Sequence, residues 1–105
     1  MRLHPNPFEM IKGGTKTIEI RLNDEKRKSI KVGDLIKFIS RENPEEAFQV
    51  EVVRLDVFDS FKDAYAAYSP KEYGGESKEE WKGMYIYYSP DEEKKHGVLG
   101  IHLSP

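Results

Sequence analysis

Three charged side chains fall within six residues of a segment that otherwise has the composition of a strand. Lys16, Glu19 and Arg21 belong to the stretch GGTKTIEIR, which begins at Gly13. A lysine can hold a phosphate or stabilise an oxyanion, and an arginine offers a planar fork for carboxylates, phosphates or base edges. A glutamate can accept a hydrogen bond or act as a general base. This combination suits a polar, nucleotide-like ligand.

The spacing of these residues favours a common site. Glu19 and Arg21 are two positions apart, so on a strand they share one face at a separation of about 6–7 Å. Lys16 has the opposite parity and would point to the other face of the strand. It stands at the start of the strand after two glycines, however, where the backbone can turn its side chain toward Glu19 and Arg21. The alternative is a solvated strand face with cross-strand ion pairs, which is common for exposed charges.

A short helix is expected before this strand. Asn6 is a suitable N-cap, Pro7 suits the first helical position, and Gly13 stands just past the end. Phe8 and Ile11 would then face the core, and the helix would deliver the chain to the start of the charged segment.

Alternating or β-branched apolar residues predict four strands. In the first, Ile18, Ile20 and Leu22 share the face opposite Glu19. A parity shift near Val52 and Val53 predicts a bulge in the longest strand, as expected where a strand curves round a barrel. The four expected strands are residues 16–22, 35–39, 48–58 and 98–103.

Capping signals predict helices between the third and fourth strands. Ser60 can cap a helix over 61–68, and capping-box patterns at 77–80 and 89–92 open two more. Residues 23–28 and 71–76 are predicted to be polar loops. With no βαβ rhythm, the fold class expected is α+β: one domain over 1–105, a small, mostly antiparallel β-barrel flanked by short helices.

Composition excludes several classes of protein. The 105 residues carry a net charge of −2 and no cysteine, so neither a disulfide framework nor a thiolate metal site is expected. Nucleic acid would have to be bound through a local basic patch. Without a signal peptide or a long apolar run, a cytoplasmic location with no membrane partner is expected.

Metal and nucleophilic chemistry find little support. His4, His96 and His102 lack metal-ligand spacing, and no GxSxG elbow is present, so no metal and no cofactor are expected. The segment around Gly13-Gly14 matches neither the GxGxxG nor the GxxxxGK(S/T) spacing of phosphate-binding loops.

Six tyrosines and one tryptophan are concentrated in the helical middle of the chain. Most of them are expected to cover the barrel, while Tyr73 and Trp81 are the candidates to stack a base. We expect Glu76, Glu79 and Glu80 to lie near a helix N-terminus, where the helix dipole favours acidic side chains, although one of them can reach a cleft.

The motif Gly14-Lys16-Glu19-Arg21, followed by the turn at Gly33 and Asp34, resembles the ASCH domain family. The resemblance covers nearly the whole chain. It implies a PUA-like β-barrel and a cleft, bordered by the motif, that holds RNA or a nucleotide. We expect Lys16, Glu19, Arg21 and Lys37 to form this cleft.

Some small members of the family hydrolyse N4-acetylcytidine, and ribonuclease activity is ascribed to others. The resemblance implies a catalytic Lys, here Lys16, a Thr three residues later, and a later Glu, for which Glu76 is the first choice. Glu19 occupies the position of that Thr. A binding module is therefore expected first, and a hydrolase using Lys16, Glu19 and Glu76 is the alternative.

Overall fold

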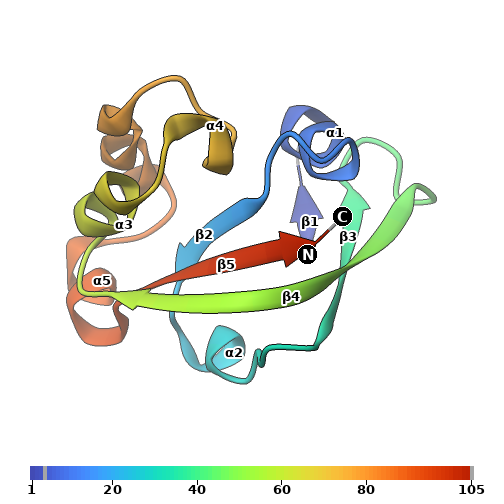
Figure 1. The fold of residues 1–105 in the computed structure, drawn as a ribbon. Coiled ribbons are helices and arrows are strands. Elements are labelled where there is room, and N and C mark those ends of the chain that lie inside the picture. Colours follow the sequence, from blue (N-terminus) through green and yellow to red (C-terminus); the bar gives the residue numbers. More distant parts are fainter. Residues whose placement is uncertain (4, 105) are drawn as a thin grey trace.

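The computed structural model describes residues 1–3 and 5–104 as an α+β structure, in which short helices flank a curled sheet and most of them gather on one side of it (Figure 1). None of the helices in these residues is long and apolar enough to cross a membrane. The elements in chain order are β1 (Arg2–Leu3), α1 (Pro5–Lys12), β2 (Ile18–Leu22), α2 (Glu25–Lys28), β3 (Leu35–Ser40), β4 (Ala47–Phe58), α3 (Phe61–Ala67), α4 (Pro70–Tyr73), the 3-10 helix η1 (Lys78–Ile86), α5 (Pro90–His96) and β5 (Val98–Ser104).

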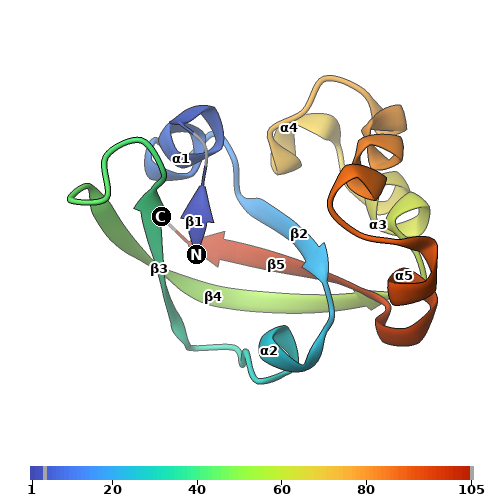
Figure 2. The same cartoon turned by 180° about the vertical axis from the view of Figure 1, so that it is seen from behind.

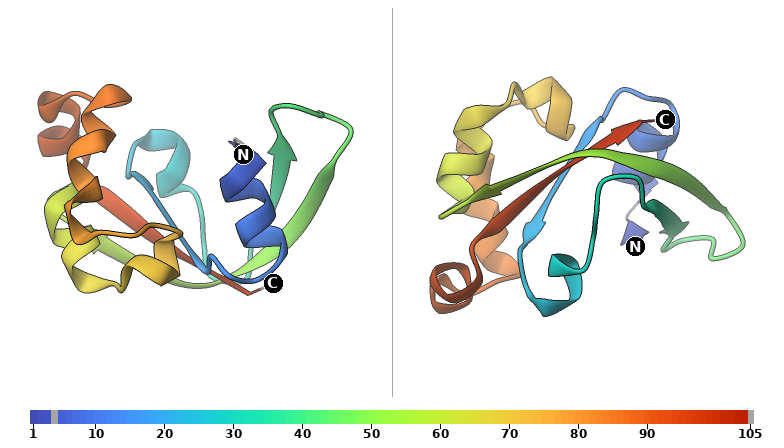
Figure 3. Two further views of the ribbon diagram at one scale, coloured as in Figure 1. Left: turned by 90° about the horizontal axis from the view of Figure 1, so that it is seen from above. Right: turned by 60° about the horizontal axis from the view of Figure 1, so that its bottom comes forward.

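The sheet has the order β1-β3-β4-β5-β2, and β2 and β1 form its two edges. Neighbouring strands from β3 to β2 are antiparallel, whereas the short β1 runs parallel to β3. The four antiparallel strands curl into a half-barrel, with α1 inside the curl (Figures 2 and 3). The expected closed barrel is thus only half formed within the described residues.

Strand β4 contains a bulge, as the parity shift predicted, and the bulge lets this strand bend within the curled sheet. Its register with β5 shifts between Val52 and Arg54. Val52 is fully buried while Val53 is exposed, and beyond the shift Leu55 packs against the same core cluster as Val52. The four strands expected from the sequence are all present, with bounds that differ by one or two residues.

The core has two parts, one on each face of the sheet. Phe8 and Ile11 of α1 are buried as predicted and fill the inside of the curl, together with Leu3, Ile36, Phe38, Val50, Val52, Leu99, Ile101 and Leu103. The helical layer, which comprises α3, α4, η1 and α5, covers the other face. There the strand residues Ile18, Ile20, Leu22 and Val98 pack with Phe61, Ala64, Tyr65, Tyr68 and Tyr73. Alternating side chains of β5 therefore serve different parts of the core, whereas β2 contributes apolar side chains from one face only.

Two expected loops contain short helices. Residues 23–28 include α2, because the Asp24 carboxylate accepts a hydrogen bond from the Arg27 N–H. Residues 71–76 overlap α4, which a capping box between Ser69 and Glu72 stabilises and Gly74 ends at φ 78°. A side-chain cap thus turned polar stretches into single helical turns.

Of the other expected helix caps, some are present and some are not. Ser60 caps α3, and a capping box at Ser89 opens α5. Asn6 was the expected N-cap of α1, but it lies inside that helix, which begins at Pro5. The segment opened by Ser77 is a 3-10 helix, and the expected capping box is not formed there: the Ser77 hydroxyl accepts from the Glu79 N–H, and the Glu80 carboxylate accepts from the Glu76 N–H.

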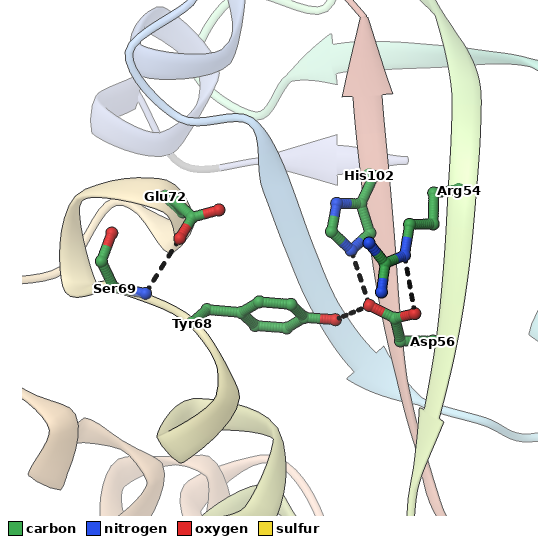
Figure 4. A network of polar contacts seen from close by, with 6 residues as sticks. All are labelled: Arg54, Asp56, Tyr68, Ser69, Glu72 and His102. Carbon is green, nitrogen blue, oxygen red and sulfur yellow. Dashed lines mark hydrogen bonds and ion pairs between the residues drawn. The ribbon is translucent and has the colours of Figure 1, made fainter.

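A polar network fastens the helical layer to the sheet (Figure 4). The Tyr68 hydroxyl donates to Oδ2 of Asp56 at 2.7 Å, and Nε2 of His102 lies 2.8 Å from the same oxygen. The other oxygen of Asp56 accepts from Arg54 Nε at 3.0 Å. Tyr68 reaches this carboxylate across Gly100 of β5, where a Cβ would meet the Tyr68 hydroxyl at 2.3 Å.

We expect Gly100→Ala to lower the free energy of unfolding by about 1–3 kcal/mol, because the methyl group displaces the Tyr68 ring from its place between α3 and the sheet. Urea denaturation measures this change. Gly83→Ala is the matched control, since a Cβ there meets no atom within 4 Å. Equal stability of the two variants would contradict this packing of Tyr68.

Candidate functional site

A cavity of about 380 Å³ opens at the free edge of β2, between the half-barrel and the helical layer. In Figure 1 this strand runs between α1 on one side and α4 on the other. The half-barrel and the helical layer both contribute residues to the lining, which consists of Leu3, Pro7, Lys16, Glu19, Ile20, Arg21, Arg41, Tyr65, Tyr73, Met84, Tyr87 and Tyr88.

The three charged residues of the opening motif meet in this cavity. Lys16 Nζ lies 2.9 Å from Oε1 of Glu19, and Arg21 Nη2 lies 3.4 Å from Oε2. Each carboxylate oxygen thus has one cation as its partner. Glu19 is 5% exposed and Lys16 9%, so the alternative of a solvated strand face is wrong.

Glycines explain how Lys16 reaches Glu19 despite its parity. After α1 ends, Gly14 adopts φ 82°, and the Lys16 N–H donates to the Met10 carbonyl at 3.0 Å. Gly74, at the end of α4, borders the lysine stem closely, since a Cβ there would lie 2.9 Å from Lys16 Cδ. The chain therefore folds back over α1 before β2 begins, and the lysine enters the cavity from the strand end.

Burial and pairing act in opposite directions on the charged groups. Burial alone would raise the pKa of Glu19, but Lys16 and Arg21 hold it below its usual value. Burial would lower the pKa of Arg21, whereas Glu19 and the Tyr88 hydroxyl raise it. Glu19 and Arg21 therefore stay charged at neutral pH, and together with Lys16 they form one compact ionic group, which we call the K-E-R group.

Tyrosines from the helical layer form the wall opposite the charges. The Tyr65 and Tyr73 rings lie 4.6 Å apart between centroids, and the Tyr73 hydroxyl donates to the Ser77 carbonyl at 2.8 Å. Burial and the charge of Glu19 raise the pKa of Tyr65, which therefore stays neutral. Tyr87 is exposed at the mouth. The structure thus places Tyr73 in the lining, at the end of α4 rather than in a loop.

Other predicted site residues lie outside the cavity lining. Lys37 is exposed on β3, and the Nζ atoms of Lys62 and Lys82 lie 5.8 and 5.7 Å from the centroid of the Trp81 ring. Three acidic candidates, Glu76, Glu79 and Glu80, are also exposed and do not line it. The carboxylate in the lining is thus Glu19.

Arg41 is a cavity residue that sequence reasoning missed. It follows β3 and is exposed, and its N–H donates to the Leu3 carbonyl at 2.9 Å. The parallel pairing of β1 with β3 therefore brings it to the cavity. No local motif marks Arg41, because its position depends on a strand contact between residues far apart in the sequence.

No group of three or more acidic or histidine side chains that could hold a metal occurs within residues 1–3 and 5–104. Of the histidines, His102 pairs with Asp56 outside the cavity, and His4 lies outside the described residues. Chemically, the lining offers three cations, one carboxylate and a set of aromatic rings, with a net positive charge of two.

We expect Glu19→Gln to lower the free energy of unfolding at pH 7 by about 3 kcal/mol, because it leaves two largely buried cations without their counter-charge. Thermal or urea unfolding measures the change. Glu79→Gln is the matched control: its ion pair with Lys82 is exposed, so the loss there should stay within about 0.5 kcal/mol. A loss of similar size in both variants would contradict the role given to the K-E-R group.

The depressed pKa of Glu19 also predicts a pH dependence. An unfolded glutamate titrates near pH 4.3, so the ionised group contributes its full stabilisation above about pH 5. That contribution is lost as the pH falls through the lower folded value. The stability difference between wild type and Glu19→Gln should therefore be constant from pH 7 to about 5 and shrink below about 4.3. Urea titrations at each pH test this, and a difference that widens in acid would refute it.

Comparison with known proteins finds solved structures similar to this chain and a matching domain family. The chain is similar to the crystal structure of hypothetical protein PH0355, with 36% identity, a TM-score of 0.83, and coverage of 100% of this chain and 95% of that one. It is also similar to the solution NMR structure of protein PF0455 from Pyrococcus furiosus, with 30% identity, a TM-score of 0.73, and coverage of 100% and 97%. No curated protein matches. The model of the ASCH domain matches residues 1–105, and the chain belongs to the ASCH domain family.

Proposed function

We propose that this chain is a cytoplasmic, single-domain binding module with a PUA-like fold, which holds a nucleotide or the end of a short RNA strand in the cavity beside β2. The observation that carries the proposal is the contrast in charge. The whole chain has a net charge of −2, but the cavity lining has three cations against one carboxylate. A local positive site on an acidic protein favours a small anionic ligand over an extended polyanion.

The arrangement of the lining fits the parts of a nucleotide. Tyr65, Tyr73 and Tyr88 offer flat apolar surface for a base, and stacking of this kind contributes roughly 1–3 kcal/mol per base. Arg41 at the exposed end is free to meet a phosphate, for which an arginine fork is well suited. Ligand pockets commonly have about 300–1,000 Å³. A cavity of about 380 Å³ therefore suits one nucleotide unit rather than a long strand.

A nucleoside monophosphate should accordingly bind to the wild type and about tenfold more weakly to Arg41→Ala, because a charge-assisted phosphate contact is lost. Isothermal titration calorimetry with the four ribonucleoside 5′-monophosphates and a short single-stranded RNA measures this.

Arg54→Ala is the matched control, since Arg54 is exposed on β4 outside the cavity lining. Its affinity should equal that of the wild type, and Arg41→Ala should melt at the wild-type temperature. Flat titrations for all ligands, or equal affinity of the two arginine variants, would refute the proposal.

A hydrolase is the second candidate, and the Lys16–Glu19 contact favours it. The buried ammonium can polarise a carbonyl, while the carboxylate at 2.9 Å can accept a proton or activate water. No serine or threonine stands among the lining residues, so a hydroxyl nucleophile from the lining has no support. Glu76 would have to move to take part, because it is exposed outside the lining.

Release of cytidine from N4-acetylcytidine, followed by chromatography, tests this second candidate. Turnover by the wild type that Lys16→Ala abolishes would establish it, provided that the variant keeps its circular dichroism spectrum. Absence of turnover would leave the binding module, and cleavage of the short RNA in the same assay would indicate a ribonuclease.

A further inference from the structure

The cavity runs along the unpaired edge of β2. Glu19 and Arg21 line it from one face of the strand, and Tyr65 and Tyr73 line it from the helical layer that covers the other face. β2 is the last strand in the sheet order, with β5 as its neighbour on one side. A cavity that touches both faces of such a strand must pass along its free edge.

The register of β2 shows which backbone groups point to that edge. Leu103 N–H donates to the Thr17 carbonyl at 2.8 Å, and Asn23 N–H donates to the Gly97 carbonyl at 2.9 Å. In an antiparallel pair, residues alternate between bonding to the partner strand and pointing away from it. These two bonds fix the alternation, so both the N–H and the C=O of Ile20 point away from β5.

Ile20 is the residue of this alternating set that lines the cavity. Its side chain is held in the core beneath the helical layer, and the residue is 4% exposed. Within residues 1–3 and 5–104, no hydrogen bond to the N–H or C=O of Ile20 is found. A buried backbone donor and acceptor side by side, both unpaired, usually have a partner.

We propose that Ile20 reads the hydrogen-bonding edge of the base: its N–H donates to a ring nitrogen or carbonyl oxygen of the base, and its C=O accepts from the neighbouring ring or exocyclic N–H. This inference rests on the proposed nucleotide-binding function and names the part of the ligand that is recognised. Every nucleobase carries an acceptor next to a donor on its Watson–Crick edge. The base then lies beside β2 as one residue of a neighbouring strand would, and its faces contact the tyrosines.

A peptide strand added to β2 would use the same atoms, but the cavity favours a shorter ligand. Such a strand would bond along the whole edge, to Ile18 and Leu22 as well as Ile20. Ile18 and Leu22 do not line the cavity. One donor and acceptor pair, flanked by the K-E-R group and by aromatic rings, matches a single flat ring.

Methylated nucleotides test the proposal without altering the protein. Each 5′-monophosphate is compared by calorimetry with a partner blocked on that edge: 3-methyl-UMP, N4,N4-dimethyl-CMP, 1-methyl-GMP and N6,N6-dimethyl-AMP. For the nucleotide that binds most tightly, we expect the blocked partner to bind at least tenfold more weakly. A change away from the edge, as in 5-methyl-UMP or 5-methyl-CMP for a pyrimidine and 7-deaza-GMP or 7-deaza-AMP for a purine, should change affinity less than threefold.

Amide hydrogen exchange at Ile20, followed by NMR, separates a lost hydrogen bond from a steric clash. The unmodified nucleotide should slow exchange of the Ile20 N–H at least tenfold and leave the edge amides of Ile18 and Leu22 unchanged. Tight binding with no edge selectivity and no protection of Ile20 would overturn this inference while leaving the proposed function intact. Binding of none of the four nucleotides would overturn both. Protection that also includes Ile18 and Leu22 would indicate strand addition instead.

Discussion

The site depends on a carboxylate held between two cations on an edge strand. Glu19 lies on β2, buried, with Lys16 and Arg21 on its two oxygens. Removing charges from water is costly unless they are paired, so the group persists only as a unit. Its placement in turn requires the glycine turn after α1 and the cover of the helical layer. The charges therefore connect α1, β2 and the helices into one cavity.

Two parts of the molecule keep this cavity open. On one side α1 fills the half-barrel, and on the other the network of Tyr68, Asp56 and His102 fastens α3 to the sheet. Because the sheet is a half-barrel rather than a closed one, β2 has a free edge. That edge leaves the backbone of Ile20 available, and the tyrosines of the helical layer stand over it.

Local signals in the sequence predicted the elements, and long-range contacts decided the rest. Parity placed the strands and the bulge at Val52, and the motif placed Lys16, Glu19 and Arg21 together. Composition alone made residues 71–76 a loop, whereas a capping box and a positive φ at Gly74 form α4 there. The position of Arg41 could not be predicted from the sequence, because the pairing of β1 with β3 brings this residue to the cavity.

Shift mapping by NMR tests the central claim, that the cavity beside β2 is the ligand site. Backbone amide shifts of the labelled protein are followed while a ribonucleoside 5′-monophosphate is added. We expect saturable shifts concentrated at β2, Arg41, Tyr73 and η1, with the outer face of β3, including Lys37, unchanged. Saturable shifts centred elsewhere, or no shifts at millimolar nucleotide, would contradict the account.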